Sequence, residues 1–149
     1  GAAGVLDAVE ALGVPVRGAV TYDGSGLSRE DRLRPATLTS VLEVAGSADH
    51  PELRAVLSGL PIAGFTGSLE YRFDATDPGR GFVSAKTGTL TGVSGLAGMV
   101  TDRTGTPLIF ALLADQIEPV DTLGARSALD DVTSALAACR CGGAGTVAP

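Results

Sequence analysis

A single lysine, Lys86, stands among the eleven basic residues of the chain, in the strand-like run V-S-A-K-T-G-T over residues 83–89. A cation beside a hydroxyl on a strand can hold a carboxylate. The pattern alone is weak, because a lysine at a strand end is usually a solvated charge and a three-residue match often occurs by chance. A phosphate loop is excluded, since G-x-x-x-x-G-K-[ST] requires glycine where the chain has Arg80 and Ala85.

The serine chemistry that accompanies K-T-G needs two further motifs, and this sequence lacks both. The nucleophile of that chemistry stands in S-x-x-K, but the residue three positions before Lys86 is Val83. The middle motif, Ser-x-Asn, is absent because the chain contains no asparagine. The sequence therefore carries half of such an active site.

The composition favours a packed globular segment. Hydrophobic residues make up 44% and charged residues 19% of the 149 residues, which argues against disorder. A net charge of −6 without a basic run argues against a nucleic-acid or acidic-membrane partner. No apolar stretch approaches the roughly 20 residues of a membrane span, and residues 1–4 lack the charged start of a signal peptide.

Two cysteines, Cys139 and Cys141, form a C-x-C pair near the C-terminus. The pair is too sparse for a structural zinc site, which needs four ligands, so no metal and no cofactor are expected. Bridging residues i and i+2 is geometrically awkward. We therefore expect these cysteines to be unpaired, or paired outside the chain.

Helical periodicity, turn residues and first-turn prolines divide the first part of the chain. They predict, in order, a helix at 5–12, a short strand at 19–22, helices at 35–45 and 51–58, and an irregular connection over 60–81.

The second part is expected to form a meander followed by a helix. The predicted elements are strands at 82–90, 93–101 and 108–114 and a helix over 119–140. The unbroken apolar run of the third strand predicts burial on both faces. One face of the last helix is expected to be apolar, and Asp130 and Asp131 are expected on its solvated face; the apolar residues are Val120, Leu123, Leu129, Val132 and Leu136.

These elements predict an α+β fold in which helices pack on an antiparallel three-stranded meander. One edge of such a sheet would be unpaired and apolar, so we expect a preceding N-terminal segment to complete it. A single domain portion is predicted over 1–141, followed by a flexible tail at 142–149.

Five segments in order resemble the D-alanyl-D-alanine carboxypeptidase/endopeptidase family of low-molecular-mass penicillin-binding proteins, peptidase family S13. The resemblance covers residues 1–114, with the last helix also in its expected place. The segments are D-G-S-G-L-S-R at 23–29, P-A-T-L at 35–38, L-P-I-A-G-F-T-G-S-L at 60–69, V-S-A-K-T-G-T-L at 83–90 and G-V-S-G-L-A-G at 92–98.

The resemblance implies the C-terminal part of a penicillin-binding-protein or serine β-lactamase-like transpeptidase fold. Members hydrolyse the terminal D-Ala-D-Ala bond or a D-amino-acid cross-link of peptidoglycan peptides through an acyl-serine, and β-lactams acylate the same serine. In the family Ser-x-Asn lies before the D-G-S-G-L-S segment, so Gly1 would fall after it. An extracytoplasmic location is implied, and the chain by itself is expected to be inactive and marginally folded.

By this resemblance, Lys86 and Thr87 bind the carboxylate of the substrate. Gly88 lets the substrate lie against the strand, and the N–H of Thr89 completes an oxyanion hole with the N–H of the absent serine. The acylation base would come from the absent Lys of S-x-x-K.

Arg29 has two interpretations, a solvated loop charge and a groove-facing guanidinium that binds an acidic stem-peptide side chain bidentately. Thr91 stands where some members have glutamine, which leaves the finer specificity open. His50, beside a proline at a helix start, is expected to be a surface or capping residue. Asp23 and Ser25 are expected to stabilise a turn.

Two alternatives to a D,D-peptidase remain. A β-lactamase or esterase of the same superfamily would turn over the penicillin adduct quickly. A non-catalytic relic of the same fold would bind peptidoglycan or a protein partner without acylation.

Overall fold

A computed structural model describes residues 1–143 and divides the chain into two compact units, Gly1–Ser58 and Gly59–Pro149. Residues 144–149 of the predicted tail lie outside the described residues. Gly142, where that tail was expected to begin, donates its N–H to the Asp102 carboxylate over 2.8 Å. The assignment of 1–141 to one peptidase portion stays a prediction.

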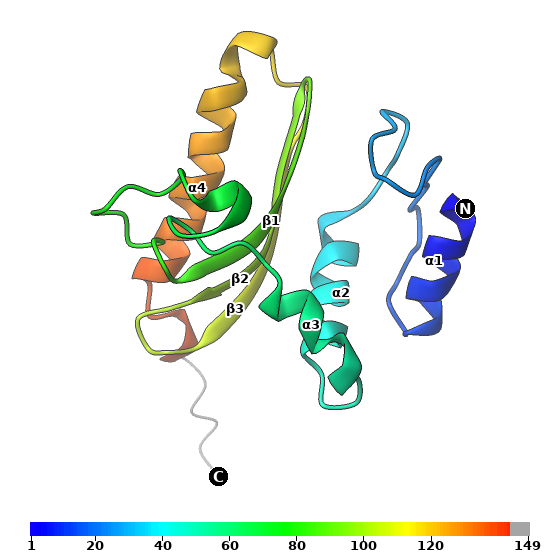
Figure 1. Ribbon diagram of the computed structural model, residues 1–149, viewed down its shortest axis with the longest axis horizontal. Coiled ribbons are helices and arrows are strands. Elements are labelled where there is room, and N and C mark those ends of the chain that lie inside the picture. The colour runs from blue at the N-terminus through cyan, green and yellow to red at the C-terminus, as the bar shows by residue number, and fades with distance from the viewer. Residues whose placement is uncertain (144–149) are drawn as a thin grey trace. The chain divides into compact units, whose positions relative to one another are not determined.

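The first unit is helical, as the sequence predicts. Its elements are α1 (Ala2–Ala11), α2 (Pro35–Gly46), the short 3₁₀ helix η1 (Pro51–Leu53) and α3 (Arg54–Ser58) (Figure 1). Proline suits the first position of α2, because it has no N–H group and an N–H there would have no partner within the helix. The predicted helix at 51–58 is split, because its first turn is a 3₁₀ helix.

The strand predicted at 19–22 is wrong. Val20 forms only an isolated antiparallel bridge with Arg32, through two hydrogen bonds of 2.8 Å. The Asp31 side chain takes the N–H of Tyr22 over 2.8 Å, so a side chain replaces the next ladder bond.

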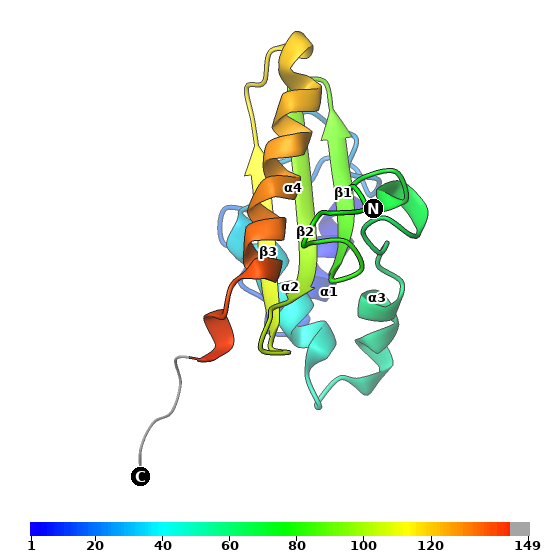
Figure 2. The same ribbon diagram turned by 90° about the vertical axis from the view of Figure 1, so that its left-hand side faces the viewer.

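The second unit contains the predicted meander. Strands β1 (Val83–Leu90), β2 (Val93–Thr101) and β3 (Pro107–Ala114) pair antiparallel in the order β1-β2-β3. Helix α4 (Thr122–Ala138), entered through η3 (Pro119–Asp121), runs along one face of this sheet (Figures 1 and 2). The predicted α+β class with an open three-stranded sheet is confirmed.

Glycines allow two features of the meander. Gly92 and Gly105 have φ angles of 79° and 82° in the two hairpin turns, a region that side chains disfavour. Gly98 lies against the backbone of β1, where a Cβ atom would overlap the Ser84 carbonyl oxygen and approach Ala85 Cα to 2.6 Å. Close pairing of β1 and β2 therefore requires glycine at position 98.

One hydrophobic core lies between the sheet, helix α4 and the connection that precedes β1. Leu69, Val83 and Ala85 are fully buried in it. Its members are Ala63, Leu69, Phe73, Val83, Ala85, Leu96, Val100, Phe110, Leu129 and Ala137.

The prediction that β3 is buried on both faces is wrong. Leu108 and Leu112 pack against the core, but Ile109 and Leu113 remain 37% and 44% exposed. Successive side chains of a strand point to opposite faces, and α4 covers only the face that carries Leu108, Phe110 and Leu112.

The apolar face predicted for the last helix is also partly wrong. Val120 and Leu123 are 89% and 74% exposed, whereas Thr133 and Ser134 are buried beside Leu129. Thr133 can be buried because its hydroxyl donates to the Leu129 carbonyl four residues earlier.

The cysteine prediction is corrected as well, because Cys139 and Cys141 are joined in a disulfide. The chain turns from α4 into the 3₁₀ helix η4 (Cys141–Gly143), which brings the two Cα atoms to 5.4 Å. That separation lies inside the usual range for a disulfide. Within residues 1–143 no helix is both long and apolar enough to cross a membrane.

Candidate functional site

Among residues 1–143, the outer edge of β1 is paired with backbone only at its beginning. Ala63 donates its N–H to the Val83 carbonyl and Ala85 donates its N–H to the Pro61 carbonyl, each over 2.9 Å. Along a strand, successive residues direct their backbone groups to opposite edges. Thr87 and Thr89 therefore direct their N–H and C=O groups toward this same outer edge, beyond the point where pairing with 61–63 ends.

Lys86 reaches that edge with its charged end. It is exposed, and its Nζ donates to the Thr87 carbonyl over 2.8 Å. Because this carbonyl faces outward, the bond places the ammonium beside the unpaired backbone of Thr87. A positive charge and outward N–H groups together can attract a carboxylate.

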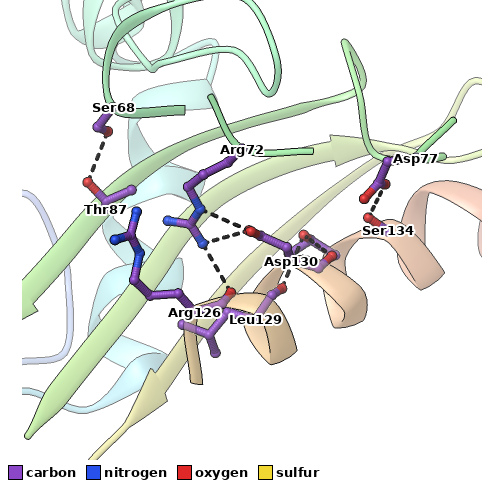
Figure 3. Close-up of polar contacts among 9 residues, drawn as sticks. Ser68, Arg72, Asp77, Thr87, Arg126, Leu129, Asp130 and Ser134 are labelled. Atoms are coloured by element: carbon purple, nitrogen blue, oxygen red, sulfur yellow. Dashed lines mark hydrogen bonds and ion pairs between the residues drawn. The ribbon is translucent and has the colours of Figure 1, made fainter. Parts of the chain in front are cut away.

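A second hydroxyl lies next to Thr87, and the sequence patterns did not identify it. Thr87 Oγ1 donates to Ser68 Oγ over 2.9 Å, although the two residues are nineteen positions apart (Figure 3). Ser68 belongs to the short 3₁₀ helix η2 (Gly67–Leu69). The only sequence signal was its place in the 60–69 segment of the family resemblance.

The connection that carries Ser68 is fixed to helix α4 by a pair of charges. Arg72 donates to both carboxylate oxygens of Asp130, from Nε over 3.0 Å and from Nη2 over 2.6 Å, and also to the Arg126 carbonyl (Figure 3). The side chains of Arg72 and Asp130 are 8% and 15% exposed. The prediction that Asp130 lies on a solvated face is therefore wrong, whereas Asp131 is exposed as expected.

The hydrogen bonds to the Asp130 carboxylate offset the effect of its burial only in part. Burial raises the pKa of its carboxyl group above the ordinary value, and the hydrogen bonds from Arg72 act in the opposite direction. A second contact lies along the same helix, where the Ser134 hydroxyl donates to Asp77 (Figure 3). The connection is thus held to α4 at two positions.

Gly88 and Thr89 complete the strand segment. Apart from Gly88 and its two chain neighbours, no atom of the described residues lies within 4 Å of the position that a Cβ atom of Gly88 would occupy, so the strand surface is open there. Thr89 is exposed, and its N–H points to the outer edge by the alternation described above. Lys86, Thr87, Gly88 and Thr89 therefore lie along one accessible stretch of β1.

The other candidate residues lie elsewhere. Arg29 is exposed in the unit Gly1–Ser58; its proposed role stays a prediction. Asp23 accepts the N–H groups of Ser25 and Gly26 over 2.9 and 2.6 Å, which confirms the predicted turn.

His50, which is expected at the surface, has an acidic partner. Its Nδ1 atom lies 3.2 Å from Glu52 Oε1, and the His50 side chain is 31% exposed. Within residues 1–143, no three His, Cys, Asp or Glu residues are grouped to hold a metal ion.

Comparisons with known proteins agree with the fold and with the family resemblance of the sequence. The model of the D-Ala-D-Ala carboxypeptidase 3 (S13) family matches residues 1–136. Carboxypeptidase DacB of Mycolicibacterium smegmatis is 42% identical over 141 residues, which are 93% of this chain and 30% of that protein. D-alanyl-D-alanine carboxypeptidase of Actinomadura sp. is 41% identical over 70% of this chain and 20% of its own length.

A solved structure shares the architecture. Penicillin binding protein 4 of Haemophilus influenzae, crystallised with a β-lactam, superposes with a TM-score of 0.70 at 32% identity, over 77% of this chain and 26% of that one. The chain thus spans less than a third of the length of these relatives.

Proposed function

Because the chain belongs to the D-Ala-D-Ala carboxypeptidase 3 (S13) family, we propose that it is part of a serine-type D-Ala-D-Ala carboxypeptidase/endopeptidase. The enzyme would act on peptidoglycan stem peptides through an acyl-serine intermediate. The observation that carries the proposal is the Lys86 ammonium beside the outward backbone of Thr87, on an unpaired stretch of strand edge.

Each residue of that stretch has a chemical role in the proposal. Lys86 and the Thr87 hydroxyl bind the terminal carboxylate of the peptide. Gly88 lets the peptide lie along the strand edge, as an added strand does. The Thr89 N–H stabilises the oxyanion, and one such donor contributes about 2.7–4 kcal/mol to transition-state stabilisation.

The remaining groups come from outside this sequence. The nucleophile and the acylation base would belong to an upstream segment with S-x-x-K and Ser-x-Asn, and that segment is the chain's proposed partner in the active site. The other proposed ligands are stem peptides that end in D-Ala-D-Ala and inhibitory β-lactams. We place this chemistry on the outer side of the cytoplasmic membrane, where peptidoglycan is found.

The test is acylation of a fused protein, in which residues 1–149 follow the portion of the M. smegmatis carboxypeptidase DacB that precedes its matched region. After incubation with benzylpenicillin, intact-mass spectrometry should show one penicilloyl adduct, and the chain alone should remain unmodified. Lys86→Ala should slow acylation roughly 10- to 100-fold, since hydrogen bonds to charged groups contribute about 1.5–3 kcal/mol. Arg103→Ala, which removes an exposed cation from the β2–β3 turn, is the matched control.

Other outcomes would favour other functions. An adduct that forms and is rapidly hydrolysed would support a β-lactamase or esterase. A folded fused protein with neither an adduct nor hydrolysis of a D-Ala-D-Ala peptide would contradict the proposal and favour a non-catalytic binding protein.

A further inference from the structure

We propose that Ser68 is a positioning residue for carboxylate recognition, acting through the Thr87 hydroxyl. This inference rests on the proposed function, because Ser68 would act on the same carboxylate site through the hydroxyl group that binds the carboxylate. The observation behind it is the 2.9 Å hydrogen bond between Thr87 Oγ1 and Ser68 Oγ. Both residues lie in the unit Gly59–Pro149.

Ser68 is held in place by its neighbours. The next residue, Leu69, is fully buried, and its carbonyl accepts the Gly64 N–H over 2.9 Å. On its other side, Gly67 has a φ angle of 56°, and a Cβ atom there would approach Pro61 Cγ to 3.2 Å. The hydroxyl of Ser68 therefore projects from a turn whose backbone has little freedom.

The chemistry of two adjacent hydroxyl groups explains why this position matters. Each hydroxyl has one proton to donate and can also accept, and it rotates to suit its partners. In the structure Thr87 donates to Ser68. When a carboxylate binds, Thr87 can turn its proton toward that anion, and Ser68 can then donate its own proton to Thr87 Oγ1.

In that reversed arrangement the hydrogen bonds run from Ser68 to Thr87 and from Thr87 to the carboxylate. A hydroxyl that accepts one hydrogen bond becomes a stronger donor in the next. The Thr87 oxygen also keeps a partner throughout, so the change of direction leaves no polar atom unsatisfied. Lys86, whose Nζ lies on the Thr87 carbonyl, supplies the charge beside this relay.

The test is steady-state hydrolysis of a D-Ala-D-Ala peptide by the fused protein described above. Ser68→Ala should raise KM about two- to ten-fold with kcat nearly unchanged, because the loss of one neutral hydrogen bond weakens binding by roughly that factor. Ser68→Thr keeps the hydroxyl and should restore the original KM. A purely structural role would instead lower kcat or the melting temperature, and Ser68→Thr would not rescue it selectively.

A double-mutant cycle makes the test specific. In a Thr87→Val background, Ser68→Ala should leave KM unchanged, since the relay has already been removed. An equal KM for the wild type and Ser68→Ala, or an undiminished effect in the Thr87→Val background, would overturn the inference. If the unsubstituted fused protein shows neither hydrolysis nor acylation, the proposed function itself fails, which is a separate outcome.

Discussion

The ion pair between Arg72 and Asp130 gives the sharpest prediction about stability. Arg72→Met removes the cation but keeps most of the side-chain volume, and it leaves a carboxylate that is only 15% exposed without its partner. Two hydrogen bonds of 2.6 and 3.0 Å are lost, as is the bond to the Arg126 carbonyl. Breaking a buried pair in this way costs about 3–5 kcal/mol, and the residual exposure of Asp130 favours the lower value.

The loss should depend on pH with a definite sign. Burial already raises the pKa of Asp130 in the folded chain, and removal of Arg72 should raise it further. A group whose pKa is higher in the folded state contributes stability at low pH and loses it as the pH rises through the folded-state pKa. The Arg72→Met chain should therefore lose more stability at pH 7 than near pH 4, where a larger fraction of Asp130 is protonated.

The assay is urea unfolding followed by far-UV circular dichroism, and the double variant decides the outcome. Arg72→Met/Asp130→Leu replaces the pair with apolar groups, which is often close to neutral, so it should be more stable than Arg72→Met alone. If a single variant is unfolded in water, recovery of the helical signal in the double variant gives the same information. If Arg72→Met lies within about 0.5 kcal/mol of the wild type, or if the double variant is less stable than Arg72→Met alone, the reasoning is refuted.

Two further predictions concern the hairpins. The Thr104 hydroxyl and backbone N–H groups, including that of Gly142, hold the pKa of Asp102 well below its ordinary range. The stability of the folded chain should therefore fall as the pH drops below about 4. In thermal melts, Asp102→Asn should make the melting temperature less dependent on pH in this acid range. Gly98→Ala should destabilise the sheet by about 1–3 kcal/mol in urea unfolding, because its methyl group would overlap the Ser84 carbonyl. Gly88→Ala is the matched control, with open space at its Cβ position, and an equal loss in both would contradict this explanation.

The meander could be predicted because its information is local. Strand-length apolar runs, a Thr-Gly turn and an Asp-Arg-Thr-Gly turn set the boundaries of the strands to within one residue. The predictions that were wrong for this part of the chain concerned which side chains are buried. An apolar run in β3 did not reveal that only one face would be covered, because the sequence does not say how many layers pack against the sheet.

The helix α4 shows the same difficulty from the polar side. Thr133 and Ser134 are buried because one hydroxyl bonds to the preceding helical turn and the other to Asp77. Asp130 is partly buried because Arg72 comes from a segment 58 residues away. A polar residue is expected at the surface unless its partner is known, and hydrophobic periodicity does not identify partners.

The irregular connection over residues 59–82 makes both the contacts with α4 that the sequence did not predict and the contacts that shape the candidate site. It contributes Pro61 and Ala63 to the edge of β1, Ser68 to Thr87, and Arg72 to α4. An exposed strand edge is a liability unless part of it is covered, and this connection covers β1 only as far as Ala85. Among residues 1–143, the outward backbone groups of Thr87 and Thr89 have no strand partner for that reason. The length of the cover therefore determines which residues of the K-T-G strand an extended peptide could reach.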